Sequence, residues 1–420
     1  MPSHDVRPEP STSPPALRSR TSKTRSFTSL TLGALAFVAL GTALVAALPG
    51  CSGSSDGATV TPETPDAASD SSSPVPTGST TGSTSPDAAP EPSGTYFPPA
   101  NGAGAWATVD PTAAGWDAKA LSDVKDWIGQ TNGTSFLVLA DGKILTEAYW
   151  TSDETTLRDI ASAQKSIVSL LTGIAMSGSS FKDSDTVSSL VPAGWTNDTP
   201  ANESTITVRQ LLTMTSGLDD NLMRVADPGS TWRYNTNAYH CLEGVLEAKS
   251  GKSLQDFTRS ALFDRIGAGA SAWTTRQFQK DGKGQPIHAL EMTARDMARV
   301  GLLVQANGAW NGTPIVPSSY LTVALDTSQT LNPSYGLLWW LNGKSSYLLP
   351  PSQPGTGPLM PSAPVDLVAA LGAADQKIYV SRSQKLVVVR QGKAASQGTQ
   401  ALSDFDDQLW KRLLAARAAK

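Results

Sequence analysis

A long tract without large apolar side chains sets the first limit on what this 420-residue chain can fold into. From Ser52 to about Ser93 the chain consists almost entirely of Ser, Thr, Pro, Gly, Asp and Ala. Such a segment cannot bury enough apolar surface to offset the entropy lost on ordering. We therefore expect a flexible tether over residues 52–98 and one folded domain over residues 99–420.

The segment before the tether has the features of an export signal. Four basic residues between positions 18 and 25 precede Leu30–Leu48, an apolar run without any charge. The run ends at Leu48-Pro-Gly-Cys51, which resembles a bacterial lipobox, although proline before the glycine is unusual there. We predict that residues 1–51 are a leader and that Cys51 is lipidated; an uncleaved membrane anchor is the alternative. Either arrangement exports the domain to the periplasmic side or the cell surface.

Charge and cysteine content exclude several classes of protein. The net charge is −4, so nothing in the composition indicates a nucleic-acid partner. Cys51 and Cys241 are the two cysteines, and lipidation of the first leaves no disulfide framework. Beyond His4 in the leader only His240 and His288 remain, too few for a histidine-rich metal site. We expect no metal or cofactor, and membrane contact only through the N-terminal lipid or anchor.

Hydrophobic periodicity predicts a mixed α+β domain. Two alternating runs around Asp141-Gly142, within Ser135–Trp150, predict a β-hairpin. The predicted helices are Ala118–Gln130, Ile160–Met176, Val208–Met214, Asn237–Lys249, Ala294–Ala306 and Ser403–Ala415, and the later strands are Gly336–Leu341, Lys377–Val380 and Leu386–Arg390. These elements indicate a sheet built from both chain ends, with the helical middle of the chain forming a second lobe.

The helix predicted over Ile160–Met176 carries the first chemical signal. Its aliphatic side chains share one face, whereas Ser162, Lys165 and further Ser and Thr residues share the other. Lys165 is the only charged residue between Asp159 and Lys182. A face of small residues with one lysine indicates a covered surface rather than a solvated one. Burial would lower the pKa of the lysine and make it a base for Ser162, one turn away in the first helical turn.

Two other patterns share the letters of a nucleophile motif but not its context. Ser179-Ser-Phe-Lys182 repeats the Ser-x-x-Lys spacing, but it lies in a polar loop without apolar periodicity. Gly53-Ser-Ser-Asp-Gly57 matches Gly-x-Ser-x-Gly, a motif that needs a strand, a turn and a helix, yet these residues lie in the tether. We therefore assign the nucleophile to Ser162.

Three further segments resemble one group of enzymes. Ile206–Leu218, ITVRQLLTMTSGL, and Pro228–Gly251, which contains Tyr234-Asn-Thr236, are similar to motifs of the serine β-lactamase and penicillin-binding-protein superfamily. Glu291–Pro317 resembles the helix and turn of class C β-lactamase-like esterases and 6-aminohexanoate-oligomer hydrolases. The resemblance runs from about Trp106 to the C-terminus. It implies a β-lactamase/transpeptidase-like fold, with an antiparallel sheet flanked by helices and an inserted, mostly helical lobe.

The resemblance also implies roles for individual residues. Ser162 matches the nucleophile, Lys165 the adjacent base, and Tyr234 the tyrosine that exchanges protons with the serine and the leaving group. Donors and cations around Tyr234 would lower its pKa so that it acts as a base near neutrality; a packed aromatic residue is the alternative. The backbone N–H groups of Ser162 and Ala373 would form the oxyanion hole.

Two positions depart from that family pattern, and both concern the substrate. Thr236 stands where β-lactamases and peptidases carry an asparagine that holds the substrate amide. Ala370-Leu371-Gly372 occupies the place of a Lys-Thr-Gly strand and keeps only the glycine, which would let the strand approach the acyl group. Thr236 and Gly372 are expected substrate-binding positions, and loss of the lysine argues against penicillin-type and D-Ala-terminal substrates.

A few other residues leave the choice between site and core open. Trp232, Trp339 and Trp340 could line an acyl or leaving-group pocket, or they could belong to the core. His288 is expected in a loop, at the surface or with its hydrogen bonds satisfied.

These features together predict an exported serine hydrolase that cleaves an ester or amide through an acyl-enzyme on Ser162. Its substrate would be a small molecule or a cell-wall fragment, and carboxylesterase or short-amide hydrolase activity is preferred. One alternative is a true class C β-lactamase or D,D-peptidase. Another, of a different class, is a non-catalytic lipoprotein that binds cell-wall material.

Overall fold

The computed structural model describes residues 94–178, 181–396 and 400–417. The predicted leader, Cys51, the tether up to Ser93, and Ser179 of the second Ser-x-x-Lys spacing lie outside these ranges. Within them, no helix combines the length and the hydropathy needed to cross a membrane.

A six-stranded antiparallel sheet organises the domain, in the order β2-β1-β13-β12-β11-β8. Its strands are β1 (Gly133–Ala140), β2 (Lys143–Tyr149), β8 (Trp340–Leu341), β11 (Val368–Gly372), β12 (Gln376–Ser381) and β13 (Leu386–Gly392). The first two form the predicted hairpin, and both turn residues have positive φ, 49° at Asp141 and 87° at Gly142, as a two-residue type I′ turn requires. β1 also pairs with β13, which confirms that both chain ends build the sheet.

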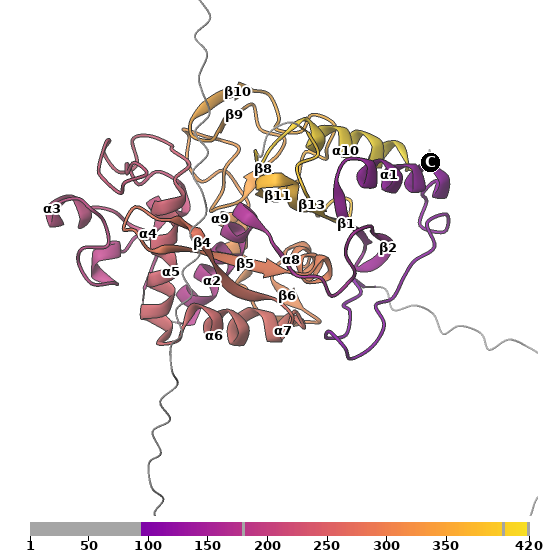
Figure 1. The fold of residues 1–420 in the computed structure, drawn as a ribbon, viewed down its shortest axis with the longest axis horizontal. Helices are drawn as coiled ribbons and strands as arrows, with labels where there is room; N and C mark the ends of the chain where they lie inside the picture. Colours follow the sequence, from indigo (N-terminus) through magenta and orange to yellow (C-terminus); the bar gives the residue numbers. More distant parts are fainter. Residues whose placement is uncertain (1–93, 179–180, 397–399, 418–420) are drawn as a thin grey trace, which may run out of the picture. The chain divides into compact units, whose positions relative to one another are not determined.

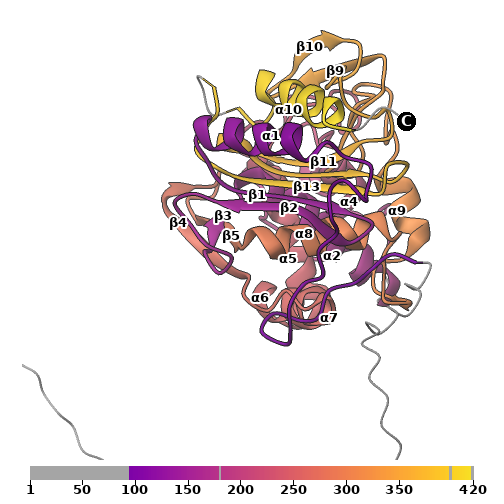
Figure 2. The same cartoon turned by 90° about the vertical axis from the view of Figure 1, so that its right-hand side faces the viewer.

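One face of the sheet is covered by the first and last helices, which lie side by side (Figures 1 and 2). Asp117 begins α1 (Ala118–Gln130) as an N-cap, because its carboxylate accepts the backbone N–H of Ala120. Trp127 of this helix stacks on Phe405 of α10 (Asp404–Ala415), with 5.1 Å between the ring centroids. Both helices agree with the predicted ranges.

The opposite face carries the helices that lead to the candidate site (Figure 2). α8 (Ala294–Gln305) packs against β1, β12 and β13, and a Cβ added at its Gly301 would lie 2.4 Å from Val387. α2 (Gln164–Gly178) packs on the same side against β11. Glycine at position 301 therefore lets α8 lie close to the sheet.

The lobe between α2 and α8 contains more strand than the sequence indicated. Its helices are α3 (Pro200–Glu203), α4 (Val208–Leu212), α5 (Thr236–Ser250), α6 (Leu254–Thr258) and α7 (Asp264–Ile266), with a short 3₁₀ turn η2 (Val187–Ser189) and a π-turn η3 (Arg259–Phe263). A three-stranded sheet in the order β3-β5-β4 joins them, formed by β3 (Arg158–Asp159), β4 (Ala272–Lys280) and β5 (Pro286–Met292). His288, expected in a loop, lies in β5. Most of β4 is exposed, so it shows no apolar alternation to predict it from.

The predicted helix Ile160–Met176 differs from the structure at its start. The α-helix begins only at Gln164, and η1 (Ala161–Ala163), a 3₁₀ turn, precedes it. Ala161 has a φ of 50°, a left-handed conformation that an α-helix cannot contain. Ser162 consequently lies in this turn and not in the first turn of an α-helix.

The predicted strand Gly336–Leu341 is also shorter in the structure. Only β8 is a strand, since Leu338 has a φ of 60° and the backbone N–H of Gly336 bonds to the Trp339 carbonyl to close a turn. The remaining elements are the helix α9 (Ser318–Ala324), two hairpins and a 3₁₀ turn: β6 (Ala309–Trp310) with β7 (Thr313–Pro314), β9 (Ser346–Leu349) with β10 (Gln353–Thr356), and η4 (Ala373–Asp375).

Candidate active site

Ser162 lies in a strained turn between β3 and α2. The left-handed residue before it, Ala161, donates its backbone N–H to the carboxylate of Asp159 at 2.7 Å. Ile160 donates its backbone N–H to the carbonyl of Leu290 in β5 at 3.1 Å. Residues in sparsely populated backbone regions persist only where their surroundings enforce them. These two contacts hold the turn and fix the direction of the Ser162 side chain.

The polar support of this turn comes from β4 and was not predicted. Arg276 binds both carboxylate oxygens of Asp159 at 2.7 Å and donates to the side-chain oxygen of Gln164 at 3.2 Å. Gln164 also accepts the backbone N–H of Leu290 at 3.1 Å. A bidentate Arg–carboxylate pair combines strength with directional precision. The pair lies more than 100 positions apart in the sequence, so no local spacing could have indicated it.

Lys165 is buried beside Ser162. Its side chain is 3% exposed, and its Nζ lies 3.2 Å from Ser162 Oγ and 3.2 Å from Thr236 Oγ1. The ammonium position also lies over two rings, 4.9 Å from the centroid of Tyr234 and 4.7 Å from that of Tyr239. Burial lowers the pKa of Lys165 to about 7; Arg276 acts in the same direction and Glu243 opposes it. The helix face is covered, as its composition indicated.

Tyr234 also contacts Ser162, but its pKa is shifted in the direction opposite to the prediction. Its hydroxyl forms a hydrogen bond with Ser162, which favours the phenolate. Burial outweighs this contact and raises the pKa of Tyr234 to about 12. The expected fall in the pKa of Tyr234 is therefore wrong. The phenol remains protonated near neutrality and can act as a hydrogen-bond or proton donor.

Asn235 sets the positions of its two neighbours at the start of α5. Its side-chain oxygen accepts the N–H of Ala238 at 3.0 Å, and its amide donates to the carbonyls of Leu218 and Asp219 at 2.9 and 2.8 Å. This buried N-cap ends the extended segment at Tyr234 and begins the helix at Thr236. Thr236, expected at the substrate, accepts a hydrogen bond from Lys165 in the structure.

β11 packs directly on the turn that carries Ser162. A Cβ added at Gly372 would lie 2.2 Å from the carbonyl oxygen of Ile160 and 3.1 Å from the backbone nitrogen of Ala163. Glycine is required here because two backbone segments touch. The close approach expected at Gly372 is thus made to the backbone next to Ser162. Ala373, the predicted second oxyanion donor, begins η4, which packs against the same turn.

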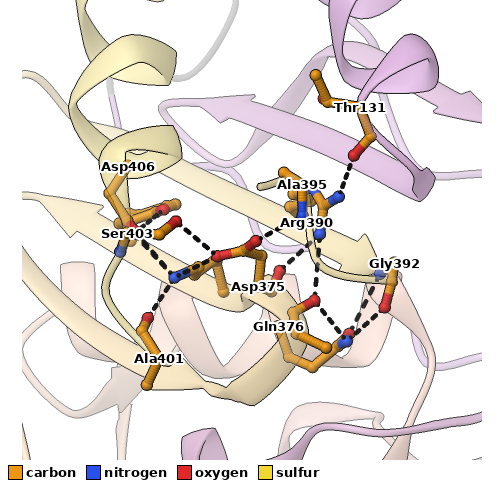
Figure 3. A network of polar contacts seen from close by, with 12 residues as sticks. Thr131, Asp375, Gln376, Arg390, Gly392, Ala395, Ala401, Ser403 and Asp406 are labelled. Atoms are coloured by element: carbon orange, nitrogen blue, oxygen red, sulfur yellow. Dashed lines mark hydrogen bonds and ion pairs between the residues drawn. The ribbon is translucent and has the colours of Figure 1, made fainter. Parts of the chain in front are cut away.

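A buried ionic cluster holds the turn after Gly372 (Figure 3). Ala374 and Asp375 in this turn have φ values of 57° and 60°. Lys377, fully buried in β12, contacts Asp375 at 3.1 Å and Asp406 of α10 at 2.9 Å. Arg390 of β13 donates to the carbonyl of Asp375 at 3.0 Å. Lys377, Arg390 and the two carboxylates therefore secure the backbone of the turn that follows Gly372.

Aromatic side chains form the wall behind Tyr234. Trp340 stacks on its ring at 6.1 Å between centroids, and Tyr335 meets Trp340 edge-to-face at 4.9 Å. Trp232 packs on Tyr335 at 5.5 Å, and Trp232, Trp339 and Trp340 are all buried in the core. A cavity of about 70 Å³ beside this wall is lined by Trp340, Leu349, Pro350, Gln400, Ala401 and Leu402.

The geometry supports one kind of chemistry. A neutral Lys165 can donate an N–H to Thr236 and keep its lone pair for the proton of Ser162. A pKa of about 7 for Lys165 suits a base, and a pKa of about 12 for Tyr234 suits a proton donor. The site can therefore attack a carbonyl carbon. Over the ranges that the structure covers, no group of three or more His, Cys, Asp or Glu side chains could hold a metal ion.

Comparison with known proteins agrees with this geometry. The family model described as Beta-lactamase matches residues 118–408, and no curated protein sequence matches the chain significantly. The fold is similar to that of a candidate 6-aminohexanoate-dimer hydrolase from Bacillus anthracis, with a TM-score of 0.57, 17% identity, and 77% of this chain and 89% of that chain covered.

Two further solved structures have a similar fold. A candidate β-lactamase from Bacteroides dorei has a TM-score of 0.56 and 16% identity, over 72% of this chain and 100% of that chain. EstCE1, a hydrolase with promiscuous acyltransferase activity, has a TM-score of 0.53 and 15% identity, over 72% of this chain and 98% of that chain. At these identities the likeness concerns the fold alone.

Proposed function

Since the chain belongs to the beta-lactamase family, we propose that it is a serine hydrolase that cleaves esters or short amides through an acyl-enzyme on Ser162. One observation carries the proposal: the buried Lys165 amine lies 3.2 Å from Ser162 Oγ, and burial brings its pKa to about 7. A serine needs such a base, because its alcohol alone is a weak nucleophile.

The proposed reaction assigns a role to each group. Lys165 takes the proton of Ser162 while the serine oxygen attacks the carbonyl carbon, and the N–H groups of Ser162 and Ala373 stabilise the oxyanion. Tyr234, which bonds to the serine and remains protonated, gives its proton to the leaving group and recovers one from Lys165. Lys165 then takes a proton from the water that attacks the acyl carbon, and it returns this proton to Ser162 Oγ as the bond between the serine and the acyl group breaks and the acid leaves.

The substrate class follows from a missing cation. The position where related enzymes carry the lysine of Lys-Thr-Gly holds Ala370 here. Lys377, the first lysine along the chain after it, cannot substitute, since it is fully buried and held by Asp375 and Asp406. Without that cation a substrate carboxylate gains little, so neutral esters and short amides are preferred over penicillin-type compounds.

The test is active-site labelling with a fluorophosphonate probe. We expect the wild-type protein to be labelled at Ser162 and to hydrolyse p-nitrophenyl esters faster than nitrocefin. Ser162→Ala should lose both the label and the turnover, whereas Ser177→Ala, an exposed serine on α2, should keep both. Faster nitrocefin turnover would indicate a β-lactamase. If the wild-type protein takes no label, the hydrolase proposal is wrong and a binding role replaces it.

The proposed location is outside the cytoplasm, anchored by a lipid on Cys51. It rests on the basic and apolar leader and on the Leu48-Pro-Gly-Cys51 sequence. Cells that express the chain with a radiolabelled fatty acid should incorporate label into the wild-type protein but not into Cys51→Ala. An unlabelled wild-type protein that still fractionates with membranes would favour the uncleaved anchor.

A further inference from the structure

A buried carboxylate lies behind the active-site lysine. Glu243 on α5 is 4% exposed, and neither the sequence motifs nor the mechanism above use it. One of its oxygens accepts a hydrogen bond from the Tyr239 hydroxyl at 3.1 Å, and the other lies 2.6 Å from Nδ1 of His288 on β5. Burying an ionised carboxylate is costly unless it is paired and hydrogen-bonded, and these two contacts can stabilise the ionised form of Glu243.

Tyr239 connects this acid to the catalytic centre. Its ring lies between the two groups, since Lys165 Nζ is 4.7 Å from the ring centroid and the ring's hydroxyl donates to Glu243. A cation over the face of an aromatic ring is attracted to it, and a negative charge behind the ring adds to that attraction. An ionised Glu243 therefore favours the protonated form of Lys165.

The pair of Glu243 and His288 reaches solvent through His288. The side chain of His288 is 40% exposed, and a cavity of about 340 Å³ is lined by both residues together with His240, Glu247 and Asp281. His288 can exchange a proton with water there, whereas Glu243 is shielded. Proton exchange at the exposed His288 therefore determines the charge of the pair, and this charge acts on the buried Lys165.

The other charged groups around Glu243 do not replace this control. Arg276 on β4 is already bound to both oxygens of Asp159. His240 lies 3.9 Å from Glu243, but burial lowers its pKa to about 2, so it stays neutral. Glu247, one helical turn along α5 from Glu243, accepts the backbone N–H of Leu254 and adds a smaller effect in the same direction as Glu243 by raising the pKa of His288.

We propose that Glu243 and His288 are positioning residues that control the charge of Lys165 through Tyr239, a role that rests on the proposed hydrolase function. Protonated His288 keeps Glu243 ionised, and ionised Glu243 keeps the proton on Lys165 until the pH rises. The pair therefore sets the lower pH limit of activity. Neither residue touches the substrate or the reacting atoms.

The local acid–base properties agree with that direction of control. Burial raises the pKa of Glu243, while its contact with His288 opposes the rise. The hydrogen bond with Glu243 raises the pKa of His288. Glu243 in turn raises the pKa of Lys165, against the larger effect of burial. Removing either member of the pair should therefore lower the pKa of Lys165.

The experiment measures the rate of fluorophosphonate labelling of Ser162 as a function of pH. Glu243→Gln keeps the hydrogen-bonding shape without the charge, so the acidic limb should move to lower pH and labelling at pH 6 should be about three- to tenfold faster than in the wild type. His288→Asn should move the limb in the same direction, because an unassisted Glu243 takes up a proton. The double variant should match Glu243→Gln alone.

Asp123→Asn is the control, since it removes an exposed carboxylate on α1 that pairs with Lys119, and it should leave the limb unchanged. If the Glu243→Gln and His288→Asn variants are labelled but their acidic limbs lie at the same pH as that of the wild type, the inference is wrong and the hydrolase function remains supported. A wild-type protein without label overturns the hydrolase function itself. If Glu243→Gln does not fold, His288→Asn at the half-exposed position decides the question by the same limb.

Discussion

Replacing Lys377 by methionine should weaken the whole domain and slow the chemistry at Ser162. The side chain is fully buried and contacts the carboxylates of Asp375 and Asp406 and the carbonyl of Ala401. Methionine has a similar volume, so the change removes the charge and leaves the packing largely as it was. It leaves two carboxylates that keep neutral hydrogen-bond donors, among them Ala395 and Tyr379, but lose the ammonium between them.

The size of the effect follows from the burial of this cluster. Breaking a buried ionic pair by removing one partner costs about 3–5 kcal/mol, because the other charge remains in the interior. With about 2.1 cal/mol/K of unfolding entropy per residue over roughly 320 residues, that cost corresponds to a fall in Tm of about 4–8 °C. The turn at Ala374 and Asp375 should also lose its fixed conformation, which would displace the oxyanion donor proposed at Ala373.

The assay combines thermal unfolding, followed by intrinsic fluorescence, with the rate of fluorophosphonate labelling at 25 °C. Lys119→Met is the matched control, because it breaks the exposed pair with Asp123 on α1 and should change neither quantity measurably. Combining Lys377→Met with Asp406→Asn removes one of the two uncompensated charges and should recover part of the lost stability.

The reasoning is refuted if Lys377→Met unfolds within 1 °C of the wild type, or if the double variant loses the sum of the two single changes. A large loss of stability with an unchanged labelling rate would refute only the link to the oxyanion turn. The cluster would then be a structural feature of β12 and α10 alone.

Three other changes test the site. Tyr234→Phe removes the proton donor, so amide turnover should fall about 10²–10⁴-fold, while p-nitrophenyl esters, whose leaving group needs no proton, should fall less in a spectrophotometric assay. Gly372→Ala places a Cβ 2.2 Å from the Ile160 carbonyl and should abolish labelling, whereas Gly244→Ala, with nothing within 4 Å, should preserve it. Lys165→Met should inactivate the protein but stabilise it below pH 7, by several kcal/mol at ~1.4 kcal/mol per pKa unit. Burial lowers the pKa of Lys165 from its ordinary value of 10.5 to about 7, so below pH 7 the protonated amine costs the folded state stability, and this cost fades as the pH rises toward 10.5. Urea unfolding at pH 6 and pH 9 checks that sign, and a variant less stable than wild type at pH 6 would contradict it.

The elements with strong local signals were predictable from sequence. α1 and α10 agree because apolar periodicity and capping residues coincide in them, and the first hairpin agrees because Asp141-Gly142 favours a two-residue turn. β4 was not predicted because most of its side chains are exposed and show no apolar alternation. The apolar run Gly336–Leu341 was predicted to be a strand, but the structure buries most of it in a turn. Burial alone does not distinguish the two.

The candidate site was predictable only as far as local spacing reaches. Ser162 and Lys165 lie three positions apart, so a helical repeat places them together. Nothing marks Ala161 for a left-handed conformation, and the pairs Asp159–Arg276 and Glu243–His288 join residues that are distant in the sequence. The acidity of Tyr234 was predicted wrongly because it depends on burial, which spacing does not reveal.

The pairing of β1 with β13 determines when the domain can fold. Ala140 faces Leu386 in the central sheet, so the two strands that complete it are separated by nearly the whole domain. Such distant pairing is slow, and during synthesis it must wait for the C-terminal strand to emerge. A nascent chain of this kind stays open for most of its length, and an open chain is the form in which a polypeptide can be threaded through a narrow membrane channel.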